Sequence, residues 1–81
     1  MNHLDDQTFL REVGNKIRQH RKSKKLTLLD VAIKANLEEN AVQRVETGRI
    51  NSTLKTLLKI ATALEIEFKE LFDFSIYKKP L

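Results

Sequence analysis

The chain has 81 residues, which is one domain's worth of sequence, and a formal net charge of +4 with a pI of about 9.6. It has no cysteine, which excludes disulfides and thiolate metal sites and favours a reducing, cytoplasmic location. No stretch approaches the ~20 apolar residues that a membrane span requires, and residues 1–6 lack the apolar run of a signal peptide. The basic balance favours an anionic partner, of which nucleic acid is the commonest.

The basic charge is unevenly placed along the chain. Residues 16–25 carry six lysines and arginines and no acidic residue, whereas residues 65–73 carry three glutamates, one aspartate and a single lysine. One end of the molecule should therefore be positive and the other should not. Charge alone does not distinguish a nucleic-acid surface from a helix face that is merely solvated. The sequence motifs must therefore distinguish the two.

The spacing of apolar residues predicts an all-α, compact five-helix domain. Helix formers dominate, and the alternation typical of strands is scarce. The first helix is predicted over residues 8–24, because Phe9, Val13 and Ile17 recur at a spacing of four and form one inward stripe. Three residues at its start are suitable N-caps: Asp5, Asp6 and Thr8.

Two short helices joined by a tight turn follow. The second helix is predicted to start after Thr27, which forms a capping-box pattern with Asp30. It should end at Asn36, because asparagine tolerates the left-handed conformation. The third helix is predicted over residues 38–47, ending at Gly48, with few and small inward residues and a polar outer face.

The last elements are a fourth helix capped by Ser52 or Thr53, and a fifth short helix over residues 67–72. The tail at residues 73–77 alternates apolar and polar residues, which fits a short strand or an extended arm. The fourth helix is predicted to present a broad inward stripe made by Leu54, Leu57, Leu58, Ala61 and Leu64, with Ile60 alongside.

The pair of short helices is the feature that points to a function. A polar helix held by the helix before it is typical of the DNA-binding helix-turn-helix, since the major groove admits one helix. Residues 26–72 resemble the Cro/phage-repressor class of helix-turn-helix proteins, often called the Xre family. The resemblance rests on an ordered set of pieces: Ile17, Arg18, Arg21, Leu26-Thr27, Val31-Ala32, Asn36-Leu37, Val42, Val45-Glu46-Thr47-Gly48, residues 57–64 and Glu70-Leu71-Phe72.

The resemblance implies a lambda-repressor-like fold in one domain over residues 1–81, with a core at 17–72 and a tail at 73–81. It places the recognition helix on residues 38–46 and matches Arg21 and Glu46 to a structural ion pair. The base-reading, loop and phosphate-neighbouring positions together give the implied DNA-binding set: Arg18, Arg21, Lys25, Thr27, Leu28, Glu39, Asn40, Gln43, Arg44, Arg49 and Asn51.

Several of these residues admit two interpretations. Arg44 suits bidentate pairing with guanine O6 and N7, worth ~1–3 kcal/mol of discrimination, or a phosphate contact alone. The Asn40 amide suits hydrogen bonds to adenine N6 and N7, or Asn40 is a helix cap or a solvated side chain. The Glu39 carboxylate accepts a hydrogen bond from cytosine N4, or Glu39 is a tolerated surface residue that lowers the affinity for DNA. Leu28 stands where the family usually has glutamine, so a side-chain phosphate contact is lost.

Proteins of this class commonly dimerise and read two half-sites about 34–36 Å apart. We therefore expect a homodimer on a two-fold symmetric operator, and a transcriptional regulator, most simply a repressor. The acidic end is the expected dimer contact, through the apolar residues Leu64, Phe72, Phe74, Ile76 and Tyr77.

The alternative is a protein-binding module, such as an antitoxin with a toxin-type partner. Its cues are the apolar tail and the unfavourable Glu38-Glu39 pair. An enzyme is not expected, since no Gly-rich phosphate loop and no nucleophile with a neighbouring base is present. We expect no cofactor, no metal and no small-molecule ligand, because two isolated histidines without cysteine do not make a metal site.

Overall fold

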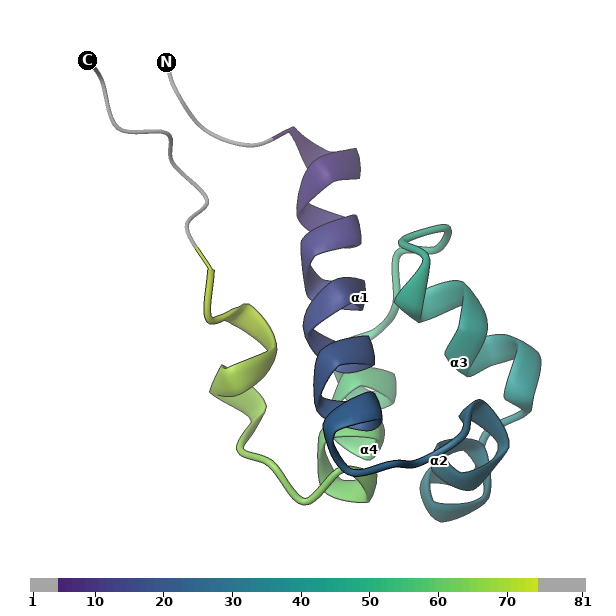
Figure 1. The fold of residues 1–81 in the computed structure, drawn as a ribbon. Helices are drawn as coiled ribbons and strands as arrows, with labels where there is room; N and C mark the ends of the chain where they lie inside the picture. The colour runs from purple at the N-terminus through teal and green to yellow at the C-terminus, as the bar shows by residue number, and fades with distance from the viewer. Residues whose placement is uncertain (1–4, 75–81) are drawn as a thin grey trace.

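The computed structural model describes residues 5–74. These residues form four α-helices and one 3-10 helix, with no strand among them. Figure 1 shows α1 at the centre, η1 on one side of it, and α2 and α3 on the other. The elements are α1 (Asp6–Ser23), α2 (Leu28–Ala35), α3 (Glu39–Glu46), α4 (Leu54–Ala63) and η1 (Phe68–Phe72).

The all-helical prediction is confirmed, but the count of five α-helices is not. The fifth element, η1, has five residues and is a 3-10 helix, in which the Glu70 N–H donates to the Glu67 carbonyl at 3.0 Å. An α-helix needs an i to i−4 ladder, and a segment this short is more often a 3-10 turn. The tail at residues 75–81, where the extended arm was expected, lies outside the described residues.

The helix starts follow from side-chain caps. α1 begins earlier than predicted, because Asp5 Oδ1 accepts from the Thr8 N–H at 2.7 Å. This backbone hydrogen bond lowers the pKa of the Asp5 carboxyl. Of the two candidates for α4, Thr53 is the cap, since its Oγ1 accepts from the Thr56 N–H at 3.1 Å.

The capping box of α2 is confirmed. Thr27 Oγ1 accepts from the Asp30 N–H at 3.0 Å, and Asp30 Oδ2 accepts from the Thr27 N–H at 2.9 Å. The bond from the Thr27 backbone lowers the pKa of the Asp30 carboxyl. At the other end, Asn36 has the predicted left-handed conformation with φ 56°. These two signals fix the short second helix at both ends.

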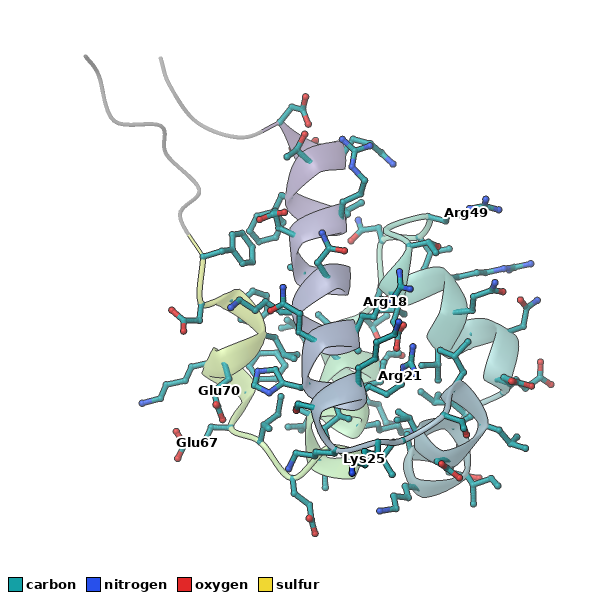
Figure 2. The ribbon with its side chains drawn as sticks, in the orientation of Figure 1. Arg18, Arg21, Lys25, Arg49, Glu67 and Glu70 are labelled. Carbon is teal, nitrogen blue, oxygen red and sulfur yellow. The ribbon has the colours of Figure 1, made fainter. Side chains whose placement is uncertain are left out.

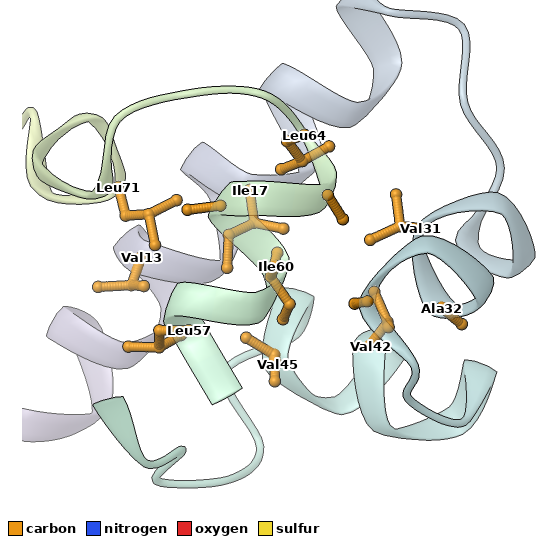
Figure 3. Close-up of a cluster of buried hydrophobic side chains, with 13 residues drawn as sticks. Val13, Ile17, Val31, Ala32, Val42, Val45, Leu57, Ile60, Leu64 and Leu71 are labelled. Atoms are coloured by element: carbon orange, nitrogen blue, oxygen red, sulfur yellow. The ribbon is translucent and has the colours of Figure 1, made fainter. Parts of the chain in front are cut away.

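One apolar core joins all five elements (Figure 3). α1 packs against α3 and η1, while α4 packs between α2 and η1. The fully buried side chains come from every element: Ile17, Val31, Val42, Ile60, Leu64 and Leu71. Leu64 was predicted as a dimer contact, and this is wrong for the fold described, because its side chain has no exposed surface.

The predicted inward stripe of α4 is too broad. Leu57, Ala61 and Leu64 are buried as expected, but Leu54 is 72% exposed and Leu58 is 54% exposed. Six of the ten residues of α4 are apolar, and together they cover more of the helix surface than the side that α4 turns toward the core. The two exposed leucines stand one turn apart and are left on the surface.

The phenylalanines form a layer at the edge of the core beside η1. Phe9, Phe68 and Phe72 were predicted as core residues, and all are half-buried and packed against it. Phe74 was expected at an interface but is also half-buried, with its ring centroid 5.5 Å from that of Phe9. The last described residues therefore pack against the start of α1. Ile76 and Tyr77 lie outside the described residues.

Candidate nucleic-acid interface

α3 has two chemically distinct sides. Val42, Val45 and Glu46 are buried against α1 and α2. The outer side carries four exposed polar residues with long or amide-bearing side chains: Glu39, Asn40, Gln43 and Arg44. Glu38 precedes the helix and makes no side-chain cap bond. A narrow apolar edge thus attaches the helix, and the rest of its surface is open to a partner.

The turn after α3 adds to this surface. Gly48 has φ 71°, and the next residue folds back so that the Arg49 N–H donates to the Arg44 carbonyl at 3.0 Å. A shallow concavity results, lined by Asn40, Gln43, Arg44, Thr47 and Arg49. Sequence analysis gave four of these five as DNA-binding residues: Asn40, Gln43, Arg44 and Arg49.

Thr47 is the residue that sequence reasoning missed, and Asn51 is one that the structure places elsewhere. Thr47 follows the last helical residue and was taken only as the helix end, although its polar side chain was a usable signal. Its Oγ1 donates to the Gln43 carbonyl at 3.1 Å. Asn51 is exposed but lines an apolar hollow between α1 and α4, so it does not share the concavity of α3.

A buried ion pair fixes α3 to α1. Arg21 Nε donates to Glu46 Oε2 at 2.6 Å, and Arg21 Nη2 donates to Glu46 Oε1 at 3.1 Å. Nη1 donates to the Leu26 carbonyl at 2.9 Å. The side chains are only 11% and 5% exposed. The pair expected from the family is therefore present. Arg21 has little guanidinium surface left for a phosphate, so it positions α3 rather than offering a free cation.

Other basic side chains on this side of the molecule are open. Arg18, Lys25 and Arg49 are exposed. Figure 2 shows Arg18 and Arg49 on the side of α1 that faces α3, while Glu67 and Glu70 lie on the other side, on or beside η1. Arg18 and Arg49 are thus separated from Glu67 and Glu70 by α1. A polyanion that approached α3 would meet cations and not these carboxylates.

The start of α2 offers backbone donors beside α3. Thr27 belongs to the DNA-binding set that the resemblance implies, but its N–H donates to Asp30 and is not available to a phosphate. The N–H groups of Leu28 and Leu29 belong to the first turn, where no preceding helical carbonyl exists for them. The Leu28 side chain packs against the core. Among the described residues, the donors of this turn are therefore Leu28 and Leu29.

Hydrogen-bonding groups dominate the surface around α3. Within residues 5–74, no group of three or more histidine, cysteine, aspartate or glutamate side chains is placed to hold a metal ion. In the same part of the chain, no helix has the length and apolarity to cross a bilayer. What the surface does hold is hydrogen-bonding side chains on one rigid helix, bordered by arginines and backbone N–H groups.

A model of the helix-turn-helix family HTH_3 matches residues 17–71. The chain belongs to this helix-turn-helix family. The resemblance to Cro and phage repressors is thereby confirmed, and the matched span runs from the middle of α1 to η1. Within this helix-turn-helix protein, α2 and α3 are the two helices of the motif.

Named relatives agree with this membership. The chain is 42% identical over 55 residues to the immunity repressor protein of Bacillus phage phi105, covering 68% of this chain and 38% of that protein. It is 31% identical over 62 residues to the transcriptional regulator SlrR of Bacillus subtilis, covering 75% and 41%. The chain thus spans about two fifths of the length of these relatives. Both are regulators, and regulation is not an enzymatic activity.

One solved structure resembles this chain over nearly the whole length of the solved protein. The restriction-modification controller protein C.AhdI of Aeromonas hydrophila superposes with a TM-score of 0.76 at 40% identity. The match covers 78% of this chain and 96% of that one. A transcriptional regulator from Vibrio cholerae superposes with a TM-score of 0.79 at 31% identity, covering 84% and 38%.

Proposed function

We propose that this chain binds double-stranded DNA through α3 and acts as a sequence-specific transcriptional regulator. The observation that carries the proposal is the division of α3. Val42 and Val45 hold the helix to the body, while Asn40, Gln43 and Arg44 stand outward together. The major groove of B-DNA is wide enough to admit one α-helix, and the exposed outer side of α3 can enter it. Residues 17–72 are the proposed DNA-binding core.

Arg44 is the proposed principal base reader. Its guanidinium suits bidentate hydrogen bonds to guanine O6 and N7, and the amides of Asn40 and Gln43 suit adenine N6 and N7. Glu39 lies in the first turn of α3 and accepts from cytosine N4 if it reaches a base. Otherwise its carboxylate faces phosphates and lowers affinity.

The surrounding donors are proposed to hold the phosphates on both sides of α3. Arg18, Lys25 and Arg49 supply positive charge, and the Leu28 and Leu29 N–H groups supply donors at the positive end of the α2 dipole. Such contacts fix the register of a protein on the duplex and carry no sequence information by themselves. Asn51 is retained as a weaker candidate, because it lies outside the α3 concavity.

The regulatory effect we propose is repression from a two-fold symmetric operator. A protein that fills the major groove at a promoter blocks access to it without any further chemistry. The similarity to a phage immunity repressor supports this direction of control. A symmetric operator follows if two copies bind together, since dimers of this class present their recognition helices about one DNA turn apart.

The salt dependence of binding tests the electrostatic half of this proposal. Binding to a mixed-sequence duplex should weaken steeply with salt, with a slope of about −0.9 in log K against log salt for each phosphate neutralised. Arg18→Gln should make the slope shallower by about 1, because it removes one phosphate contact. Fluorescence anisotropy across a salt series measures both slopes.

Lys69→Gln is the matched control, since Lys69 is an exposed residue of η1 that lies beside Glu67. It removes the same charge and should leave the slope unchanged. Equal slopes for all three proteins, or a wild-type slope near zero, would contradict the proposal. The protein-binding alternative with a toxin-type partner would then be preferred.

A further inference from the structure

An apolar hollow lies between α1 and the start of α4. α1 lines it with Phe9, Leu10 and Val13, while α4 and η1 line it with Leu57 and Phe72. Its volume is about 170 Å³. An apolar cavity of about 150 Å³ accommodates benzene. The hollow therefore has room for one six-membered ring and little more.

Ser52 adds a polar group to the wall of this hollow. Ser52 and Thr53 are both chemically suitable caps for α4, and Thr53 is the one that caps it. Within residues 5–74, Ser52 Oγ is the one buried side-chain nitrogen or oxygen atom that makes no hydrogen bond. Buried hydroxyl groups are nearly always hydrogen-bonded, because one without a partner destabilises the fold. The Ser52 hydroxyl is thus a group that a ligand in the hollow can satisfy.

The chemistry of the wall restricts what the hollow can hold. Of the described residues that line it, none is ionisable, so a charged ligand would lose its hydration without gaining an ionic partner. Phe9 and Phe72 supply aromatic surface, with ring centroids 6.4 Å apart and ring planes 16° from parallel. An aromatic ring packs favourably against such surface. The matching ligand is therefore a small, neutral aromatic ring that carries one hydroxyl group.

We propose that this hollow is a binding site for a small phenol-type compound. The ring of the ligand fills the apolar space, and its hydroxyl forms a hydrogen bond with Ser52 Oγ. Rotation of the serine side chain about χ1 turns its Oγ toward the ligand. No small-molecule ligand was expected from the sequence, because the wall of the hollow is built from elements that lie far apart in the chain.

The hollow also contacts the elements that carry the proposed DNA-binding residues. Val45, which lines it, lies on the inner side of α3, and the lining residues 50–52 directly follow Arg49. The arrangement that contains the hollow also leaves the outer side of α3 open, so a ligand that selects this arrangement should favour DNA binding. In this respect alone the inference rests on the proposed function. By linkage, phenol and DNA should strengthen each other's binding by the same factor.

Ser52→Ala tests the hydrogen bond without DNA. The dissociation constant of phenol should rise about 3- to 10-fold, as expected for one neutral hydrogen bond. Toluene has nearly the same shape and no hydroxyl, so its constant should change by less than about twofold. NMR titration of the backbone amides measures both constants. The variant should melt no lower than the wild type, because the fold loses no hydrogen bond with this hydroxyl.

Leu10→Trp tests the location of the site, because the larger side chain fills the hollow. It should abolish binding of phenol and of toluene. Ile33→Trp is the matched control, since it adds the same ring on α2, where the side chain is 69% exposed, and it should leave both constants unchanged. Circular dichroism establishes that each variant keeps its helices.

Three results would overturn the proposed site. The first is a wild-type chain that shows no saturable binding of phenol. The second is an equal loss of phenol affinity in Leu10→Trp and Ile33→Trp, because binding would then not belong to the hollow. The third is an unchanged phenol affinity in Ser52→Ala, because the hydroxyl would then have no part in recognition.

Fluorescence anisotropy with a mixed-sequence duplex tests the coupling to DNA. Saturating phenol should tighten DNA binding by the wild type at least about threefold and should leave DNA binding by Leu10→Trp unchanged. Saturable phenol binding with no change in DNA affinity would overturn the coupling. A chain that binds phenol but no DNA would contradict the proposed function alone, so the two failures are distinguished.

Discussion

Replacing Glu46 by alanine is expected to lower the free energy of unfolding by about 3–5 kcal/mol, which is a large part of the stability of so small a domain. The variant leaves the Arg21 guanidinium without its carboxylate at a site where that side chain is only 11% exposed. The remaining hydrogen bond to the Leu26 carbonyl does not neutralise the charge. Urea unfolding followed by circular dichroism at 222 nm measures the loss.

The exposed pair between Glu67 and Lys69 supplies the control. Its atoms are 3.4 Å apart and its side chains are 73% and 83% exposed. Removing it through Lys69→Ala should cost no more than about 1 kcal/mol, because water screens such pairs. Similar losses in the two variants would mean that burial does not govern the cost.

A double variant separates the effect of charge from the effect of shape. Arg21→Met with Glu46→Leu removes both charges and keeps apolar bulk between α1 and α3. Stability should return to about the wild-type value or exceed it, because no uncompensated ion remains. If the double variant were as unstable as Glu46→Ala, the ion pair would contribute through its hydrogen-bond geometry, and our description of its role would be wrong.

Replacing Gly14 by alanine is expected to destabilise the fold by about 1–3 kcal/mol. A Cβ at this position would overlap the backbone carbonyl oxygens of Val45 and Glu46 and come within 2.7 Å of the Glu46 carbonyl carbon. Backbone atoms at the end of a helix do not move aside as a flexible side chain does. The higher helix propensity of alanine offsets only about 0.5–1 kcal/mol of this loss of stability. Thermal and urea unfolding measure the difference.

Asn15→Ala is the control for this position. Asn15 is the next residue of α1 and is exposed, so the substitution raises helix propensity without a clash. It should leave stability unchanged or raise it by a few tenths of a kcal/mol. A Gly14→Ala protein as stable as wild type would show that α1 and α3 do not approach as closely as described.

Sequence alone predicted best those features that depend on neighbours in the chain. The capping box of Thr27 and Asp30 and the left-handed Asn36 are local signals, and they placed the motif correctly. The start of α1 was less certain, because Asp5, Asp6 and Thr8 are all chemically suitable caps and only the geometry selects one. The outer side of α3 followed from its polar composition once the motif was placed.

Features that depend on contacts between elements were not predictable in the same way. Periodicity counts Leu54 and Leu58 with the buried leucines, because it does not reveal how wide a side of α4 meets the core. The 3-10 form of η1 is invisible to a pattern of so few residues. The role of Gly14 arises from the end of α3, more than thirty positions away in the chain, and nothing local to Gly14 signals it.

The most direct test of DNA reading by α3 is selection of bound duplexes from a random pool, with wild-type protein and with Arg44→Ala. We predict that the wild type recovers a two-fold symmetric motif with a guanine at a fixed position in each half. The variant should lose that guanine preference, at a cost of about 1–3 kcal/mol, and keep the rest of the motif. Recovery of no motif by the wild type, or of the same guanine by the variant, would contradict base reading by Arg44.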